Sequence, residues 1–296
     1  MKLRSLAAVL LLGLVAVPPA DAGLEENLSS LVGDQATGYL GPLADGLSAT
    51  MNAGAFRGAS IPIAGVSLRL DVQASYISFS DDNRTYTAPA FGGYPSADVP
   101  TVIGDPTGAT VDHGSINGLS FNYPGGFDLA NFGTPMPQLT IGNVFGTRAM
   151  IRFASADLGD SELGDFSLFG IGAQHKVSQY LPGLPVDVAV GGIYQTFSLG
   201  EDDLVDANMY ALNVTASKVL GAALIKLEPF VGLGIDSFAM EANYDSGSES
   251  INLEFDRENQ FRGTLGANVR MPVVNIHIEG YVAAENGING SVSFGI

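Results

Sequence analysis

Apolar and polar residues alternate one by one along much of the chain. Between residues 287 and 296, Ile288, Val292, Phe294 and Ile296 share one parity, while small polar residues occupy most of the other. A period of two places alternate side chains on opposite faces of an extended strand. The pattern therefore predicts an amphipathic β-strand that runs to the last residue.

The same alternation recurs from residue 46 onward. The phase slips once, at Gly191 and Gly192, which predicts a β-bulge there. We predict antiparallel strands over residues 46–56, 66–76, 115–121, 137–144, 148–153, 169–177, 186–190, 210–217, 231–236, 261–270, 274–282 and 287–296. Alternation thus indicates about 12 strands, with roughly 10 to 14 open, and no second domain.

Alternation is common to a water-soluble β-sandwich and a membrane β-barrel, because both have strands with one apolar face. Several strands reach about ten residues, which is enough to cross a bilayer at a tilt. Charged residues lie in the middle of the polar faces, as a wet lumen allows, and the last strand has no tail. These features favour an all-β fold, a transmembrane antiparallel β-barrel with a short N-terminal helical segment.

Three parts of the chain differ in pattern. Residues 1–22 combine Lys2 and Arg4 with a short apolar run and small residues up to Ala22, which predicts a signal peptide. Residues 23–45 have mixed helical spacing, and we expect a periplasmic or lumen-plugging helical segment. Residues 46–296 are assigned to the barrel.

Composition narrows the possible partners and chemistry. The mean hydropathy is +0.23, yet beyond residue 22 no run approaches the roughly 18 apolar residues of a membrane helix. The chain has no Cys and a net charge of −18, so it forms no disulfide and nucleic acid is not an expected partner. We predict the bacterial outer membrane as its location, with outer-membrane lipid and the barrel assembly machinery as partners.

The connections between predicted strands alternate between tight turns and longer acidic loops. The loops at residues 156–164, 200–205 and 245–249 fall on the outer side when strands are counted back from a periplasmic C-terminus. The count fails for residues 80–113, which fall in the periplasm if 115–121 and 137–144 both span the membrane. One of those two segments is then not a simple spanning strand, or a further strand lies near residues 99–104.

The polar parity of the strands carries most of the charged side chains. The predicted lumen-lining residues are Arg69, Asp71, Gln73, Arg148, Arg152, Lys176, Asp236, Arg262, Arg270, His277 and Glu279. They have two interpretations, a charged pore wall that selects solutes or a packed interior in which the charges pair and close the barrel. The narrowness of a barrel of this size favours the second.

Phe238 and Met240 follow on the inward parity and suggest a hydrophobic ligand patch, unless a bulge near Ser237 turns them outward. We predict no catalytic residue, since His113 and Ser115 are too close in sequence to face each other productively. The acidic residues near Asp160 match no calcium loop, and we expect neither a metal nor a cofactor.

Three short motifs resemble a known family. These are YLGPL at residues 39–43, PMPQLTIG at 135–142 and QHKVSQYLP at 174–182. They resemble an uncharacterised family of bacterial outer-membrane barrels, a domain of unknown function. More distantly the chain is similar to the long-chain fatty-acid transporter barrels, although their Asn-Pro-Ala hatch signature is missing. The resemblance implies a barrel fold and carries over no activity.

Together these patterns lead to two functional hypotheses. The first is passage or binding of a small solute, with hydrophobic solutes among the candidates, through a plugged lumen. Its rival is a structural or surface-interaction barrel that transports nothing.

Overall fold

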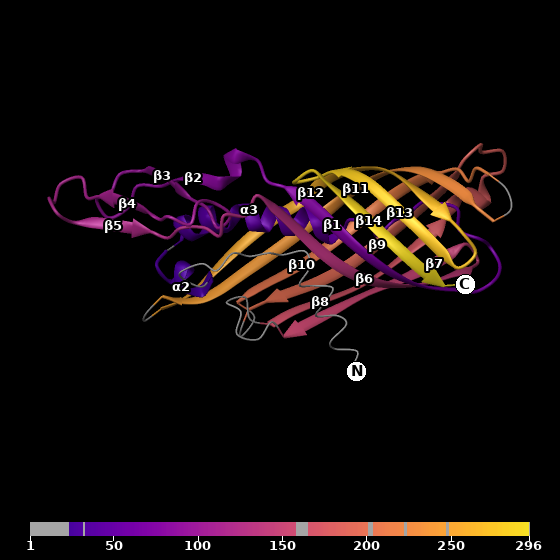
Figure 1. Ribbon diagram of the computed structural model, residues 1–296, viewed down its shortest axis with the longest axis horizontal. Helices are drawn as coiled ribbons and strands as arrows, with labels where there is room; N and C mark the ends of the chain where they lie inside the picture. Colours follow the sequence, from indigo (N-terminus) through magenta and orange to yellow (C-terminus); the bar gives the residue numbers. More distant parts are fainter. Residues whose placement is uncertain are drawn as a thin grey trace.

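The computed structural model describes residues 24–31, 33–157, 165–200, 204–221, 224–246 and 249–295 (Figure 1). The predicted signal peptide lies outside this range. So do most of the acidic loop around Asp160 and the acidic residues 201–203.

Within this range ten strands form one closed barrel in which every neighbouring pair is antiparallel. They are β1 (Ser67–Ser78), β6 (Asn131–Val144), β7 (Thr147–Asp157), β8 (Asp165–Lys176), β9 (Asp187–Leu199), β10 (Val205–Ser217), β11 (Lys226–Ser246), β12 (Glu249–Arg270), β13 (Val274–Val282) and β14 (Gly287–Gly295). The final strand pairs with β1, from Arg69 opposite Gly295 to Ile77 opposite Gly287, and so closes the barrel. The predicted all-β barrel is confirmed, with ten strands rather than 12.

The two faces of the barrel wall have the predicted polarity. On β1 the side chains of Asp71 and Gln73 are buried inside, while Leu68 and Leu70 are half exposed outside. The same holds around the barrel, whose outer face exposes Val72, Phe153, Phe169, Ile171, Tyr210, Leu212, Leu233, Phe261, Leu265, Ile278 and Ile288, among others. The outside of the barrel is therefore an apolar belt.

The ends of the barrel differ in their connections. We call the end where β14 finishes the turn end. It carries the β6–β7 turn, the segment with the 3-10 helix η2 (Val177–Tyr180), and the connections at residues 218–225 and 271–273. The opposite end, the loop end, carries the long β1–β6 connection and the outer parts of β11 and β12, which are the longest strands described.

The β1–β6 connection, residues 79–130, forms a cap at the loop end. It contains the 3-10 helix η1 (Asp81–Arg84) and the hairpins β2 (Thr85–Ala88) with β3 (Ala97–Pro100) and β4 (Ala109–Asp112) with β5 (Ser120–Tyr123). In Figure 1 the cap projects from the barrel on the side opposite the C-terminus. The predicted spanning strand at 115–121 is therefore wrong. Residues 115–119 connect β4 and β5 within the cap, and only residues 120–121 are extended, as the start of β5. Its removal from the barrel wall resolves the conflict in the strand count.

The N-terminal part is helical for longer than predicted. Helix α2 (Leu24–Ser29) lies against β11, and α3 (Asp34–Met51) runs straight through Pro42. The predicted strand at residues 46–56, and with it a barrel starting at residue 46, is wrong, because α3 continues to Met51 and β1 begins at Ser67. The apolar residues alternate there for another reason. The C-terminal part of α3 is buried on all sides, so small or apolar residues suit every position. The spacing of apolar residues then no longer distinguishes a helix from a strand.

The predicted bulge at Gly191 and Gly192 is also wrong. The strand β9 keeps one register with β8 and β10 along its length. Ile193 faces inward, in one buried cluster with Phe56. This apolar residue on the otherwise polar inner face gave the sequence the same pattern as a shift in the alternation. A register shift lies instead between β11 and β12, at Asp236 and Phe238.

No helix in the described ranges is both long and apolar enough to cross a membrane.

Candidate functional site in the barrel lumen

The lumen is occupied by the chain itself. The helix α3 and the following coil, residues 34–61, are buried over most of their length, and we call them the plug. At the loop end Tyr39 donates a hydrogen bond to the Gly125 carbonyl of the cap, at 2.8 Å. At the turn end the Ser60 carbonyl accepts bonds from Arg270, at 3.1 and 3.2 Å. The plug therefore passes through the barrel from one end to the other.

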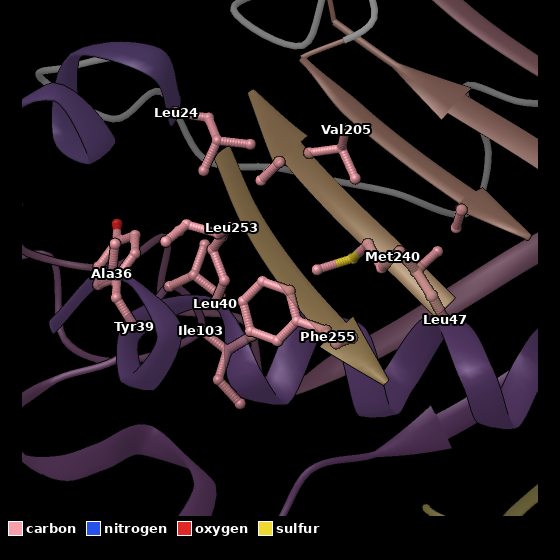
Figure 2. Packing of buried hydrophobic residues seen from close by; sticks show 14 of the residues in the cluster. Leu24, Ala36, Tyr39, Leu40, Leu47, Ile103, Val205, Met240, Leu253 and Phe255 are labelled. Carbon is pink, nitrogen blue, oxygen red and sulfur yellow. The ribbon is translucent and has the colours of Figure 1, made fainter. Parts of the chain in front are cut away.

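The loop-end half of the plug is held by apolar packing. Leu40 and Leu47 of α3 belong to one buried cluster with Met240 and Phe255 (Figure 2). Phe238 is part of the same cluster. The structure therefore places Phe238 and Met240 inward, as predicted, and the bulge does not turn them outward. The plug fills the space beside them, so they form no open ligand patch in this state.

The C-terminal end of α3 is bound by cations from the barrel wall. The last carbonyls of a helix lack partners within it and carry the negative end of its dipole. Arg262 on β12 donates to the carbonyls of Ser48 and Ala49, at 3.3 and 2.9 Å, and pairs with Asp236 at 2.6 Å. The strand thus supplies charge where the helix needs it.

Arg152 on β7 binds the junction of helix and coil. Its side chain is fully buried, and it donates to the carbonyls of Met51 and Ala53. It also donates to the side-chain oxygens of Gln138 and Gln195, each at 2.9 Å. No carboxylate of the described chain forms an ion pair with it, so neutral acceptors alone, including the Met136 sulfur at 3.6 Å, satisfy this guanidinium.

Glu279 on β13 binds the backbone of the coil. Its Oε1 accepts a hydrogen bond from the Gly54 amide at 2.6 Å, and its Oε2 lies 3.1 Å from Nε2 of His277. The other ring nitrogen of His277 lies 2.7 Å from Asn268 Oδ1. Gly54 has a φ of +67°, which a glycine adopts without strain. Both ring nitrogens of His277 are therefore engaged, and neither is free to act as a base.

Further along the coil, Arg57 reaches the wall from the plug side. It donates to Asp71 and to Gln73 on β1, at 2.7 Å each, and both members of the Arg57–Asp71 pair are buried. Arg148 on β7 in turn donates to the carbonyls of Arg57 and Gly58, at 3.1 and 3.0 Å. Plug and wall therefore exchange charged groups in both directions.

The coil leaves the lumen beside Glu228 on β11. This buried carboxylate accepts from the Ser60 amide at 3.1 Å and from the Ser217 hydroxyl at 2.7 Å, and it pairs with Arg270. Ser217 Oγ accepts from the Ala59 amide at 2.8 Å. The backbone of the coil is thus satisfied by side chains of the wall, as a buried segment without regular structure requires.

All of the predicted lumen-lining residues lie on the inner face of the wall. Asp71, Gln73, Arg148, Arg152, Arg262, Arg270 and Glu279 bind the plug directly. Asp236 acts through Arg262 and His277 through Glu279. Lys176 pairs with Asp187 at 2.6 Å, and no described contact joins Lys176 or Arg69 to the plug. The interior is packed, although Arg69, Arg148 and Arg152 form no ion pair in the described ranges.

Sequence reasoning missed Arg57, Glu228 and Gln195. Glu228 shares the parity of Asp236, so extending the alternation of β11 toward its start finds it. Gln195 was hidden by the mistaken bulge at Gly191 and Gly192. Arg57 lies in a coil, where no periodicity shows which way a side chain points.

The cap closes the loop end with aromatic side chains and hydroxyl groups. Tyr39 accepts a bond from Asn27 at 3.0 Å, and Tyr86 donates to the Gln35 carbonyl at 2.8 Å. Burial raises the pKa of the Tyr39 hydroxyl, and a hydrogen bond from Asn27 lowers it only in part. The hydroxyl stays protonated and keeps its bond to the cap.

Within the described ranges no group of three or more His, Asp or Glu side chains has the arrangement of a metal site. Nδ1 of His113 accepts from the backbone amides of Ser115 and Ile116 rather than from the Ser115 hydroxyl. The expectation that the protein is not an enzyme stays a prediction.

Comparison with known proteins gives a family and distant likenesses. The model described as "Family of unknown function (DUF6588)" matches residues 1–296. A comparison with curated proteins gives no match.

Among solved structures, the outer membrane protease OmpT from Escherichia coli is 7% identical, with a TM-score of 0.35, over 80% of this chain and 96% of that one. A Pseudomonas aeruginosa FadL homologue is 10% identical (TM-score 0.20; 78% and 89% covered). The Ralstonia pickettii toluene transporter TbuX is 12% identical (TM-score 0.19; 81% and 91% covered). At such scores no activity or ligand is transferred.

Proposed function

Because this chain belongs to the DUF6588 family, whose function is unknown, we propose a function from its own structure. The protein is an outer-membrane barrel that its own N-terminal plug holds closed, and it presents the cap at the cell surface as an interaction module. The observation that carries this proposal is the series of wall contacts that bind the plug from Ser48 to Ser60.

The apolar belt supports the location in a membrane. Leu212, Leu265 and Ile278 are each about 60% exposed on the outer face, at 61%, 68% and 62%. Soluble monomers rarely expose a continuous apolar surface of this kind, whereas membrane barrels turn such a face to lipid. By the usual asymmetry of these proteins, the turn end faces the periplasm and the loop end faces outward.

The plug supports a closed state. Arg152, Arg262 and Arg270 hold the plug by charge-assisted hydrogen bonds, each worth about 1.5–3 kcal/mol. Breaking several at once leaves buried charges without partners, which is costly. A solute passes only if this set of contacts is released together.

The cap supports a role at the surface. Residues 79–130 contain six Asp and one Arg, a net charge of −5. Ile116 and Leu119 are exposed on the connection between β4 and β5, at 53% and 42%. An acidic surface with exposed apolar residues suits contact with a protein or polysaccharide partner.

Passage of a small solute is the second candidate. An open pocket of about 200 Å³ enters the turn end and reaches Ala55 and Arg57 of the plug. A polar solute fits this pocket better than a hydrophobic one, because arginine, aspartate and asparagine side chains line it. The plug covers the apolar residues Phe238 and Met240 in the other half of the lumen. Passage then requires displacement of the plug.

Conductance across planar lipid bilayers separates the two candidates. The wild-type protein should show no steady conductance, while an Arg152→Ala/Arg262→Ala variant, or a chain lacking residues 34–61, should conduct. Open channels in the wild type would overturn the closed-barrel proposal. If both variants fail to fold, single-channel recording of the wild type still decides the question.

The surface role needs its own assay. An Ile116→Asp/Leu119→Asp variant changes only exposed residues of the cap, so the barrel should fold as before. Adhesion or envelope integrity should decline in cells that carry it. If both stay at the wild-type level, the cap has no interaction role at these residues.

A further inference from the structure

The turn end of the barrel gathers arginine side chains around its open pocket. Arg57, Arg69, Arg148 and Arg270 all line this pocket, whose volume is about 200 Å³. The chain has 13 basic residues against 31 acidic ones, so four guanidinium groups at one pocket depart from its composition. Like charges held together repel each other unless an anion lies among them.

Carboxylates of the protein neutralise two of the four. Arg57 pairs with Asp71 at 2.7 Å, and Arg270 pairs with the buried Glu228. Both arginines also bind plug backbone, Arg57 at the Gly54 carbonyl and Arg270 at the Ser60 carbonyl. These pairs account for the structural part of the cluster.

Arg69 and Arg148 have no such counter-ion within the described ranges. Arg148 donates to neutral oxygens, those of the Gln174 side chain and the carbonyls of Arg57 and Gly58. Arg69 is half-buried, and its Nη1 is buried without a hydrogen-bond partner. A buried donor of a charged group that lacks an acceptor costs free energy. Asp71 attracts Arg69, but its two oxygens bind Arg57 and Thr140. Arg69 therefore makes no hydrogen bond or ion pair in the described ranges that explains its place.

The strand register brings Arg69 and Arg148 to the same part of the wall. Arg69 on β1 lies opposite Thr140 on β6, and Arg148 on β7 lies opposite Gly142 of the same strand. At Gly142 a Cβ would meet Arg148 Cβ at 3.0 Å and Ser67 Oγ at 3.1 Å, so glycine lets the start of the Arg148 side chain lie close to β6. The Asn143 amide also lines the pocket and can donate a neutral hydrogen bond to an anion, whereas the Thr140 hydroxyl already donates to Asp71, at 3.1 Å.

We infer that this pocket is a binding site for a phosphate group, held between Arg69 and Arg148. Guanidinium groups bind phosphate oxygens through paired N–H donors, and the anion offsets the excess charge. The volume equals that of about seven waters at roughly 30 Å³ each. It admits a phosphate group with a small substituent but not a whole lipid. The group comes from a soluble phosphate compound or from the headgroup of a lipid at this membrane face.

Binding to the full-length protein tests the site. The protein is refolded in a zwitterionic detergent without phosphate and titrated calorimetrically with inorganic phosphate. A second arm compares binding to phosphatidylcholine vesicles with and without phosphatidic acid. The variant is Arg69→Gln, and the matched control is Arg257→Gln, which removes the same charge at the loop end. Arg69→Lys tests whether charge alone is enough.

Phosphate should bind the wild type and the Arg257→Gln control with equal affinity. Its affinity for Arg69→Gln should be lower by about tenfold or more, and its affinity for Arg69→Lys should lie between the two. A second outcome also supports the site: the wild type binds phosphatidic acid but not inorganic phosphate, and Arg69→Gln abolishes this binding. The phosphate group then belongs to a lipid headgroup. The inference is overturned if neither form binds the wild type, or if Arg69→Gln binds as the wild type does.

Stability without phosphate provides a second readout. Arg69 makes no described hydrogen bond or ion pair, and Arg270 repels it more strongly than Asp71 attracts it. Arg69→Gln should therefore unfold at the same or a higher urea concentration than the wild type. A clear loss of stability in phosphate-free buffer would give Arg69 a structural role and contradict the inference.

Discussion

The two halves of the plug are held in the lumen by different forces. The helical half, α3, packs apolar side chains such as Leu40 and Leu47 against the loop-end wall and the cap. The coil half, residues 52–61, has few large apolar side chains and is bound through its backbone by Arg148, Glu228 and Glu279.

The difference follows from the backbone. A helix satisfies most of its own hydrogen bonds, so its side chains are free to pack by apolar contact. A coil has unpaired amides and carbonyls, so burying it requires polar partners from the wall. The charges that contact the plug are therefore explained by the plug conformation that they meet, whereas Lys176 and Arg69 make no described contact with it.

The largest effect should come from breaking the buried ion pair of the coil half. Arg57→Met leaves Asp71 buried without its partner, which costs about 3–5 kcal/mol of unfolding free energy. Urea unfolding of the protein in lipid vesicles measures this loss. Arg57→Met/Asp71→Asn should recover part of it, and a double variant as unstable as the single one would argue against the pair as the cause.

A cavity in the helical half should cost somewhat less. Leu47 is 1% exposed within the apolar cluster, and Leu47→Ala should lower the unfolding free energy by about 2–5 kcal/mol. Amide hydrogen exchange should speed up along α3 and stay slow in β1 and β14. Equal acceleration in the coil half would show that the halves are not separately held.

Backbone strain at the coil should have an intermediate effect. Gly54 has a positive φ, and a Cβ there would meet Gln73 Oε1 at 2.2 Å. Gly54→Ala should cost about 1–3 kcal/mol, again by urea unfolding. Gly41→Ala is the matched control, since nothing lies within 4 Å of a Cβ at that position in α3, and it should be neutral or slightly stabilising.

The smallest effect should come from a partly exposed ion pair between the helical half of the plug and the barrel wall. Arg257 on β12 pairs with Asp45 on α3 at 3.0 Å, with about a third of each side chain exposed, at 34% and 30%. Arg257→Ala should change the unfolding free energy by less than about 1 kcal/mol, and added salt should reduce the difference further. A loss as large as that of Arg57→Met would remove the contrast between buried and exposed pairs.

Strand pattern carried much of the fold in advance. Alternation placed Asp71, Arg152 and Glu279 on the inner face and Leu212 on the outer face, and all four lie there. It failed at residues 46–56, where the buried end of α3 and the following coil alternate by coincidence. It also failed at Ile193, an apolar residue that the unbroken register of β9 turns toward the lumen, where it belongs to one buried cluster with Phe56.

The cap could not be predicted from the sequence for a related reason. The segment at 115–121 has the composition of a strand, yet residues 115–119 form the connection of a hairpin outside the barrel, and only residues 120–121 are extended. Local composition shows neither whether so short a segment is extended nor which sheet it joins, because strand pairing depends on residues far away in the sequence.

The sequence by itself determined the barrel and the inward set of charges, since a period of two fixes which side chains share a face. Only the tertiary structure decided what those charges do. From the sequence, Arg152 and Glu279 are equally compatible with a pore wall and with binding of an internal segment. The structure shows that both bind the plug. The reason is that the role of a charged side chain in a lumen depends on the group that it contacts. Here that group belongs to a coil, and the position of a coil cannot be predicted from the periodicity of its sequence.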